Sequence, residues 1–438
     1  MIVLKFGGTS LGSTERIKSV GQLIRAGGRK IVVLSAISGT TNLLEKYAHL
    51  LYKNENTDAR ELLESLKSQY LKTVGELFST EEHKKKGQEL ISHHFDYLES
   101  FNRDLFTLYE EKAVLAQGEL ISTALMNFYL EESGCISVLL PALSFMRIDK
   151  DHEPDLFYIR ENIKREIGKS PECNIFITQG FICRDAFGEV DNLKRGGSDY
   201  SASLIGQALD AQEIQIWTDI DGFHNNDPRF VSSTKRIDKL SFDEAAELAY
   251  FGAKILHPTS VKPAQMSNIP VRLKNTLDPE SPGTIITAST DTYGRIKAVA
   301  AKDGITSIRI KSGRMLLAYG FLRKVFEIFE RHQTAIDMIT TSEVSVSVTI
   351  DDDKHIDEIE NDLRKYGTVE LMPDQSIVCV VGDLIAESSG MARKVIDALH
   401  DIPIRMISYG SSSNNISLLI NTDNKEKALN ELSNHLFQ

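Results

Sequence analysis

Short apolar runs alternate with longer amphipathic stretches from the start of the chain to about residue 275. The runs are too short to span a membrane and are typical of buried strands. In the stretches between them, apolar residues recur every three or four positions, as in helices that pack on one face. Strands that alternate with helices predict a mainly parallel sheet covered by helices on both faces. The predicted strands are 2–4, 30–35, 137–141, 174–178, 213–218 and 270–274.

A different order follows a segment rich in Pro, Gly, Ser and Thr, where we place a linker at 285–295. Two units of strand, helix, strand, strand and helix come next, about seventy residues apart, as in ferredoxin-like folds. We expect the first unit at 296–374 and the second at 375–438. The first unit also has a last strand at 368–372, and the second unit has none after its final helix. The strand 296–301 could supply it, in which case the two units would be interleaved. The alternating domain then covers 1–284.

The 438 residues are 41% hydrophobic and 26% charged, and the net charge is −12. This composition is that of a globular protein, and the acidic balance argues against nucleic acid or an anionic membrane as the main partner. The chain has no run of 18 apolar residues and no secretory signal, so we expect a cytoplasmic protein. Its four cysteines are far apart and indicate neither disulfides nor zinc.

A paired-glycine turn follows the first predicted strand. Lys5 stands at the strand end, Gly7 and Gly8 follow, and a helix begins near Glu15. Strand, glycine turn and helix start present backbone N–H groups to an anion, and Lys5 adds a positive charge. The spacing is neither a P-loop nor a dinucleotide fingerprint. An ordinary strand-to-helix turn is the alternative, and Lys5 favours phosphate.

A second paired-glycine turn, 193–200, places Arg195 before Gly196 and Asp199 after it, ahead of a helix predicted at 201–209. Such a turn could hold a zwitterion or organise phosphate and Mg²⁺. Glu119 could accept an ammonium group, and its neighbour Gly118 indicates close approach, although an exposed helical glutamate is the commoner case. Lys254 could reach phosphate or cap a helix.

Nine segments carry a family resemblance. In chain order they are KFGGTS, VLSAISGTTNLL, QGELIS, TQGF, LKRGGSDY, IWTDIDGF, NDPR, FGAKILHP and NTLDPESPGT. Together they resemble aspartate kinase, and the C-terminal units resemble its ACT regulatory domains. ITTSEVSVSVT is most similar to the lysine-sensitive monofunctional class.

The resemblance implies a three-layer αβα amino-acid-kinase domain of the carbamate-kinase type with two ACT units. It implies transfer of phosphate from MgATP to the β-carboxylate of L-aspartate, the first step towards lysine, threonine and methionine. L-Lysine would be the effector, and a homodimer would form through the ACT units.

The resemblance also implies roles for residues at matching positions. Lys5, Asp199 and Lys254 would be catalytic. Aspartate would be bound by Thr41, Glu119, Phe181, Arg195, Gly196 and Ser198, with Glu119 on its ammonium and Arg195 on its α-carboxylate. The nucleotide would be bound by Lys5, Gly7, Gly8, Ser10, Ser35, Thr218, Asp219, His224, Arg229 and Lys254. The effector would be bound by Met315, Asp337, Ser342 and Glu343.

The chain departs from the family pattern at two places. His224 stands where Tyr is common, and Asn225-Asn226 where two threonines are usual, which bears on nucleotide affinity. Ala318 and Ala335 replace serines of lysine-sensitive relatives, which predicts weaker inhibition.

Other functions remain as alternatives. A kinase for glutamate or N-acetylglutamate is a rival, although the Glu119 and Arg195 pair suits a free α-amino acid and such enzymes lack tandem ACT units. A catalytically silent amino-acid sensor is another, and Lys5, Asp199 and Lys254 argue against it. A fused homoserine dehydrogenase is not expected, since the chain ends with the second unit.

Overall fold

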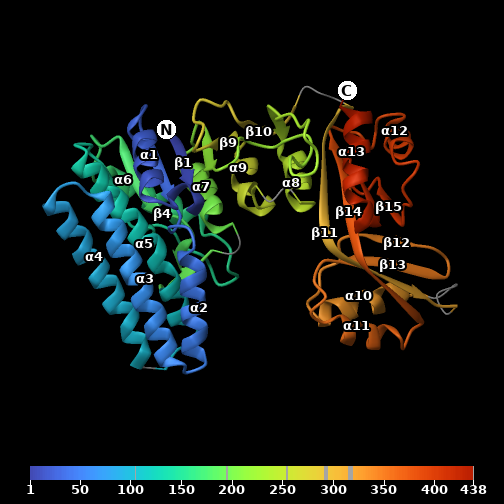
Figure 1. Ribbon diagram of the computed structural model, residues 1–438, viewed down its shortest axis with the longest axis horizontal. Coiled ribbons are helices and arrows are strands. Elements are labelled where there is room, and N and C mark those ends of the chain that lie inside the picture. The colour runs from blue at the N-terminus through green and yellow to red at the C-terminus, as the bar shows by residue number, and fades with distance from the viewer. Residues whose placement is uncertain (104, 194–195, 253–254, 291–293, 314–318, 438) are drawn as a thin grey trace. The chain divides into compact units, whose positions relative to one another are not determined.

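The computed structural model describes residues 1–103, 105–193, 196–252, 255–290, 294–313 and 319–437. The chain packs as two units, drawn in Figure 1. The first unit comprises Met1–Gly222 with Leu256–Ala288, and the second comprises Phe223–Ile255 with Ser289–Gln438. Among the described residues, no helix is long and apolar enough to cross a membrane.

The first unit is built on a sheet in which six neighbouring strands are parallel and the last, β10, is antiparallel. Its strands lie in the order β3-β4-β2-β1-β7-β9-β10. Every predicted strand of this part is present, within one or two residues of its expected ends. The strands are β1 (Ile2–Phe6), β2 (Lys30–Leu34), β3 (Val138–Leu140), β4 (Ile175–Gln179), β7 (Ile214–Thr218), β9 (Val271–Asn275) and β10 (Thr284–Thr287).

Helices cover both faces of this sheet (Figure 1). Alternate strand residues such as Leu4 and Leu34 share one core with α1–α5, whereas α7 contacts β1, β2 and β7 beside α6 and α9. Since both faces are buried, the strands are continuous apolar runs. The helices are α1 (Thr14–Arg25), α2 (Thr40–Tyr52), α3 (Asn56–Leu77), α4 (Glu81–Ser100), α5 (Leu108–Glu132), α6 (Leu156–Gly168), α7 (Gly197–Ala208) and α9 (Lys262–Met266). A hairpin and four short 3₁₀ helices complete the unit: β5 (Ile182–Arg184), β6 (Val190–Asn192), η1 (Gly8–Leu11), η2 (Phe101–Arg103), η3 (Ala142–Ser144) and η4 (Pro258–Val261).

The second unit contains a six-stranded antiparallel sheet in the order β12-β13-β11-β14-β16-β15. Its strands are β11 (Ile296–Lys311), β12 (Ile339–Thr341), β13 (Ser345–Ile350), β14 (Thr368–Gly382), β15 (Met406–Tyr409) and β16 (Asn415–Asn421). Its helices are α10 (Phe321–Arg331), α11 (Ile356–Leu363), α12 (Met391–Ala398) and α13 (Lys425–Leu436), with a short η5 (Thr422–Asn424). The helices pack with the strands into two cores, one for each ferredoxin-like half.

Two long strands are shared by both halves of this sheet. The first part of β11, Ile296–Lys302, pairs with the last part of β14, and its remainder pairs with β13 and the first part of β14. The register shifts near Gly304, which has a φ of 72°, and Asp374 has a φ of 55°. Glycine adopts such a φ without strain, so β11 can change register there. The expected boundary at 374 therefore lies inside a continuous strand, and the expected linker begins inside β10.

The segment 223–255 packs with the second unit, although its motifs resemble the kinase part of the family. It includes β8 (Lys239–Ser241) and α8 (Phe242–Tyr250). Lys297 Nζ of β11 lies 2.9 Å from Glu244 Oε2 of α8, and both side chains are buried. Gly252 lies so close to β11 that a Cβ there would be 2.0 Å from the Ala301 carbonyl oxygen. The functional division at 284 stays a prediction.

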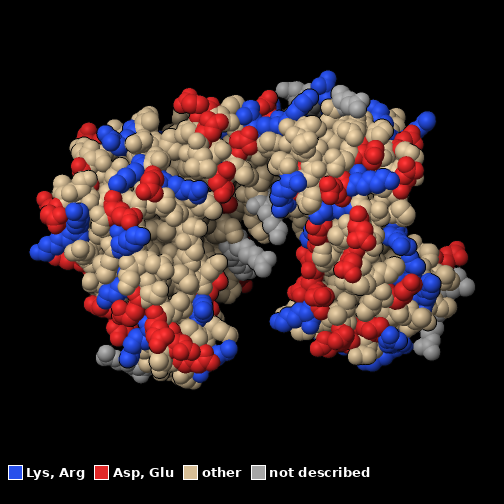
Figure 2. Space-filling view, in the orientation of Figure 1, with Lys and Arg blue, Asp and Glu red and all other residues tan. Residues whose placement is uncertain are grey.

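Acidic and basic side chains are interspersed on the face shown in Figure 2. No broad basic area is seen on that face.

Candidate active site

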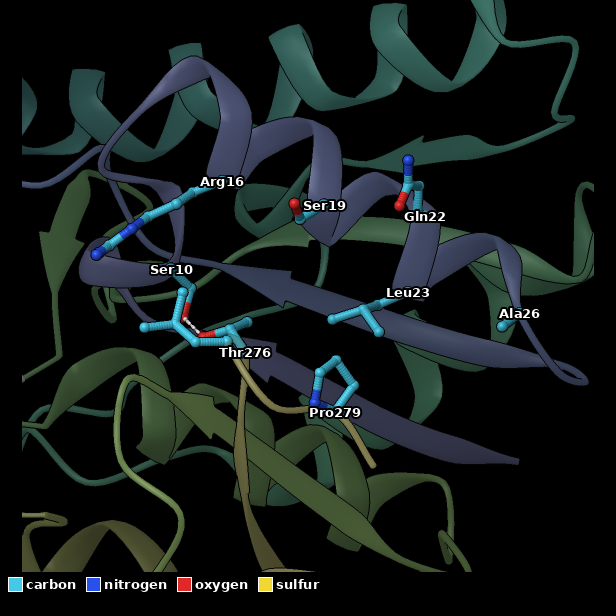
Figure 3. Close-up of a pocket in the computed structure, with 9 residues that line it drawn as sticks. Ser10, Arg16, Ser19, Gln22, Leu23, Ala26, Thr276 and Pro279 are labelled. Carbon is cyan, nitrogen blue, oxygen red and sulfur yellow. Dashed lines mark hydrogen bonds between the residues drawn. The ribbon is translucent and has the colours of Figure 1, made fainter. Parts of the chain in front are cut away.

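The first glycine turn lies at the carboxyl end of β1, against the ends of β7 and β9. Gly7 N–H donates to the Trp217 carbonyl at 3.2 Å, and η1 begins at the next residue. Ser10 is buried, and its Oγ lies 2.9 Å from Thr276 Oγ1, as Figure 3 shows. Thr276 N–H in turn donates to the Thr218 carbonyl at 2.8 Å. These contacts hold the turn at the strand ends, where ligands of such sheets bind.

Thr276 was not among the predicted site residues. It lies in the NTLDPESPGT segment, but nothing in a lone threonine after a strand indicates a partner 266 positions away. Asp219, which was predicted, is exposed and accepts from Thr218 Oγ1 at 3.0 Å.

A groove of about 390 Å³ lies beside the Ser10–Thr276 pair (Figure 3). It runs along α1 and does not include Lys5, Glu119 or Asp199. Its lining residues are Ser10, Arg16, Ser19, Gln22, Leu23, Ala26, Thr276, Leu277 and Pro279.

Lys5 and Asp199 form an ion pair between β1 and α7. Lys5 Nζ lies 2.7 Å from Asp199 Oδ1, and the two side chains are only 12% and 13% exposed. The helix begins at Gly197, four residues before the predicted Ser201, so Asp199 lies in its first turn. Gly196 precedes it with a φ of 75°. A carboxylate in the first turn interacts favourably with the helix dipole, which helps to hold Asp199 beside Lys5.

Glu119 is buried in the middle of α5, with 3% of the residue exposed. Burial raises the pKa of this carboxyl from 4.5 to about 8, although the N–H groups of Ala36 and Glu119 and the positive charge of Lys5 oppose the shift. Its Oε2 has no hydrogen-bond partner among the described residues. A buried oxygen without a partner is costly, and such groups are typical of sites that complete their contacts with a ligand.

Gly118 lets the loop after β2 approach α5. A Cβ at Gly118 would lie 2.7 Å from the Ala36 Cβ and 3.2 Å from Thr40 Cγ2. The prediction that this glycine permits a close approach is therefore confirmed. The same contact brings the Ala36 N–H to the Glu119 carboxylate.

The loop itself is held by hydroxyl groups. The Ser35 carbonyl accepts from Ser122 Oγ at 2.8 Å, and Thr40 Oγ1 lies 2.9 Å from the Tyr70 hydroxyl. The helix α2 begins at Thr40, so Thr41 lies in its first turn. Tyr70 comes from α3, and only the folded structure shows that it reaches this loop.

The turn after β4 contacts the start of α7. Phe181 has a positive φ of 68°, and its N–H donates to Ser201 Oγ at 2.9 Å. A Cβ at Gly180 would lie 2.6 Å from the Ser198 Cβ. The structure thus brings Phe181, Gly196 and Ser198 to the same side of the sheet edge as Asp199.

Other predicted residues lie elsewhere or outside the described residues. His224 and Arg229 belong to the second unit, where His224 Nδ1 lies 3.2 Å from Thr234 Oγ1 and Arg229 pairs with Asp227. Arg195, Lys254 and Met315 lie outside the described residues, as does Ala318.

The predicted effector carboxylates differ sharply in their surroundings. The Asp337 side chain is 1% exposed, and its Oδ1 lies 2.7 Å from both Lys302 Nζ and the Tyr250 hydroxyl. Glu343 is exposed, and so is Ser342, whose Oγ lies 2.8 Å from Ser345 Oγ. Asp337 thus has internal partners, which the sequence did not indicate.

Comparison with known proteins agrees with this geometry. The Amino acid kinase family matches residues 1–275, and an ACT domain matches residues 378–436. Lysine-sensitive aspartokinase 3 of Escherichia coli is 32% identical over 461 residues, covering 100% of this chain and 99% of the relative. Chloroplastic aspartokinase 3 of Arabidopsis thaliana is 35% identical over 465 residues, covering 100% and 81%. The chain belongs to the aspartokinase family.

Solved aspartokinase structures have the same fold. That of E. coli aspartokinase III in complex with lysine and aspartate matches with a TM-score of 0.86 and 32% identity, over 100% of both chains. The Clostridium acetobutylicum aspartate kinase matches with a TM-score of 0.87 and 27% identity, also over 100% of both. The chain is thus an aspartate kinase, a phosphotransferase with an ATP-binding amino acid kinase domain followed by an ACT region.

The raised pKa of Glu119 predicts a pH-dependent loss of stability. The unfolded chain releases this proton near pH 4.5 and the folded chain near pH 8, so the folded state binds more protons between these values. The contribution of Glu119 to the free energy of unfolding is fully present below pH 4.5 and is lost as the pH rises to 8. Glu119→Gln should remove this loss and leave the variant more stable at pH 8.5, by on the order of a few kcal/mol.

Urea unfolding between pH 5.5 and 8.5 measures this difference. Glu64→Gln, on the exposed face of α3, is the control and should follow the parent chain. Parallel pH profiles for the Glu119→Gln variant and the parent would contradict the prediction.

Proposed function

We propose that this aspartokinase phosphorylates the β-carboxylate of L-aspartate with MgATP at the edge formed by Lys5, Glu119 and Asp199. The observation that carries the proposal is a buried carboxylate, Glu119, near an ammonium group that is itself paired with Asp199. An E. coli relative has been solved with aspartate and ADP, which supports the same substrate and nucleotide here.

In this proposal Glu119 binds the α-ammonium of aspartate, which supplies the partner that Oε2 lacks among the described residues. Arg195 binds the α-carboxylate. The turn residues around α7 and the first turn of α2 complete the pocket, namely Thr41, Phe181, Gly196 and Ser198. The nucleotide phosphates lie at Gly7, Gly8 and Ser10. The other residues proposed to bind the nucleotide are Ser35, Thr218, Asp219, His224, Arg229 and Lys254.

The reaction needs no general base, because the nucleophile is a carboxylate that is already ionised at neutral pH. The protein must align two anions and neutralise charge that spreads over the phosphoryl oxygens. Lys5 is suited to this because its ammonium group is held in place by Asp199 at 2.7 Å. Mg²⁺ would add Lewis-acid stabilisation of the phosphates. Asp199, which pairs with Lys5, is the carboxylate of this edge that would supply an oxygen ligand.

Two substitutions separate the proposed roles. Lys5→Ala should lower kcat by about 10²- to 10³-fold with much smaller changes in either KM, since its charge acts mainly in the transition state. Arg195→Ala should mainly raise the KM for aspartate, by the equivalent of about 2–5 kcal/mol for an unpaired carboxylate. Lys18→Ala is the control, because this half-buried lysine of α1 donates to the Glu76 carbonyl of α3 and has no proposed role in the site. Steady-state kinetics in which the two effects are exchanged would contradict the assignment.

We also propose feedback inhibition by L-lysine. The E. coli relative is named lysine-sensitive and has been solved with lysine. Since Asp337 has Lys302 and Tyr250 as partners, Glu343 is the exposed carboxylate of the predicted set that a cation from solution can reach. Met315, Asp337 and Ser342 complete the predicted site. A homodimer through the ACT units would cover the edge strands β12 and β15, where Ile339, Ile407 and Tyr409 are exposed.

Millimolar L-lysine should therefore reduce the rate of the full-length enzyme, by favouring a state that binds aspartate or ATP less well. The inhibition should be weaker than in relatives with serines at positions 318 and 335, since each missing hydroxyl removes about 1 kcal/mol. Glu343→Ala should relieve inhibition and keep the basal rate, whereas Glu358→Ala on α11 should change neither. A rate that millimolar lysine leaves unchanged would make the lysine proposal wrong.

A further inference from the structure

We propose that Asn226 is a positioning residue that fixes the nucleotide-binding loop to the C-terminal helix α13. The loop, residues 223–231, carries His224 and Arg229. The inference rests on the nucleotide role proposed above for Arg229. It assigns to the last helix of the second ferredoxin-like half a part in holding the nucleotide site.

The carboxamide of Asn226 uses its donor and its acceptor in two directions. The residue is 3% exposed, and its Nδ2 donates to the Leu429 carbonyl in α13 at 2.9 Å. Its Oδ1 accepts from the Asp227 N–H, also at 2.9 Å. A buried amide needs partners for both ends, and Asn226 finds one on α13 and one in the loop.

Asp227, whose N–H bonds to Asn226, is in turn hydrogen-bonded to Arg229. Its Oδ1 accepts from the Arg229 N–H at 2.9 Å, and its Oδ2 lies 2.6 Å from Arg229 Nη2. The guanidinium side chain is nevertheless 76% exposed, so it remains open to a ligand. A continuous path of hydrogen bonds thus runs from the backbone of α13 to the base of the Arg229 side chain.

Contacts at the other end of the loop reinforce the attachment. Val231 is buried in one core with Leu429 and Leu432 of α13. Lys425 Nζ lies 4.1 Å from the centroid of the Phe230 ring and 2.6 Å from Asp303 Oδ2. Such a cation–π contact adds a modest attraction.

The neighbouring asparagine joins the loop to β11. The Asn225 carbonyl accepts from Val299 N–H at 2.9 Å, and Asn225 Oδ1 accepts from Lys235 N–H at 2.7 Å. The backbone of Asn225 therefore connects the loop to β11, and the side chain of Asn226 connects it to α13. The link to α13 needs the carboxamide donor at position 226, which a threonine at that position would not supply in the same way.

Steady-state kinetics of Asn226→Asp and Lys425→Met test the proposal. Asn226→Asp keeps the acceptor for the Asp227 N–H but places an oxygen against the Leu429 carbonyl, so it breaks the link to α13 with almost no change in volume. Lys425→Met removes the contacts to Phe230 and Asp303 and keeps most of the side-chain length. Each should raise the KM for ATP by about three- to tenfold, the effect of one lost hydrogen bond or cation–π contact on the loop position.

The KM for aspartate and kcat should change less than twofold, since the proposed aspartate pocket lies in the first unit. A merely structural role would lower the thermal stability without this selective change in KM. Asn421→Ala is the matched control, because Asn421 accepts from Asp423 N–H before α13 and, among the residues that the structure describes, its side chain makes no hydrogen bond to the loop.

Arg229→Ala distinguishes this inference from the function on which it rests. If Arg229→Ala raises the KM for ATP and both anchor variants leave it unchanged, the inference is wrong and the nucleotide role stands. If Arg229→Ala itself leaves the KM for ATP unchanged, the nucleotide role is wrong, and the inference fails with it. A selective rise in all three variants, with Asn421→Ala unchanged, supports both.

Discussion

Burial of the Glu119 carboxylate near the Lys5–Asp199 ion pair is the constraint on which the first unit depends. Charged groups at the edge of an apolar sheet are costly unless each finds a partner. Lys5 and Asp199 form an ion pair, whereas Glu119 has only the Ala36 and Glu119 N–H groups and a more distant lysine. The Glu119 carboxyl therefore lacks a partner that a cationic group would supply. The α-ammonium of an amino acid is such a group.

Several features of the fold bring the segments around these residues together. Parallel strands bring the turns after β1, β2, β4 and β7 to one edge. Gly118 removes the Cβ that would push the β2 loop away from α5, and the Ser10–Thr276 pair joins two strand ends that are far apart in sequence. In the second unit the shared strands β11 and β14 join both ferredoxin-like halves into one sheet. The segment 223–255 is attached to that sheet through Glu244 and Gly252, and to α13 through Asn226.

The sequence predicted the strands well and the long-range partners poorly. Runs such as 30–35 and 174–178 were recognisable because strands buried on both faces have no polar alternation. The glycine turns were recognisable because paired glycines after a strand are unusual, and Glu119 because it follows a glycine within a helix and lies in the QGELIS segment of the family. Helix starts were predicted less closely. The helix α7 begins at Gly197 and not at Ser201, because a positive φ at Gly196 allows the chain to enter the helix there.

The remaining differences depend on contacts between distant segments. The sequence around Asp337 suggested a free carboxylate, yet Lys302 and Tyr250 contact its Oδ1 from 35 and 87 residues away, and only its Oδ2 lacks a hydrogen-bond partner among the described residues. The motifs at 223–255 resemble a kinase, and no local pattern indicates that this segment packs with β11 and α13. Likewise the strand expected at 296–301 continues to Lys311 as β11, because the polar stretch at Lys302–Gly304 is a register shift within one strand and not a loop.

The central claim is that the edge around Lys5, Glu119 and Asp199 transfers phosphate to aspartate. Trapping of the acyl phosphate with hydroxylamine tests it most directly, with purified protein, MgATP and either L-aspartate or L-glutamate. The account predicts aspartyl hydroxamate at a rate that Glu119→Gln reduces strongly, and little product from glutamate. Robust turnover of glutamate with none of aspartate would contradict it.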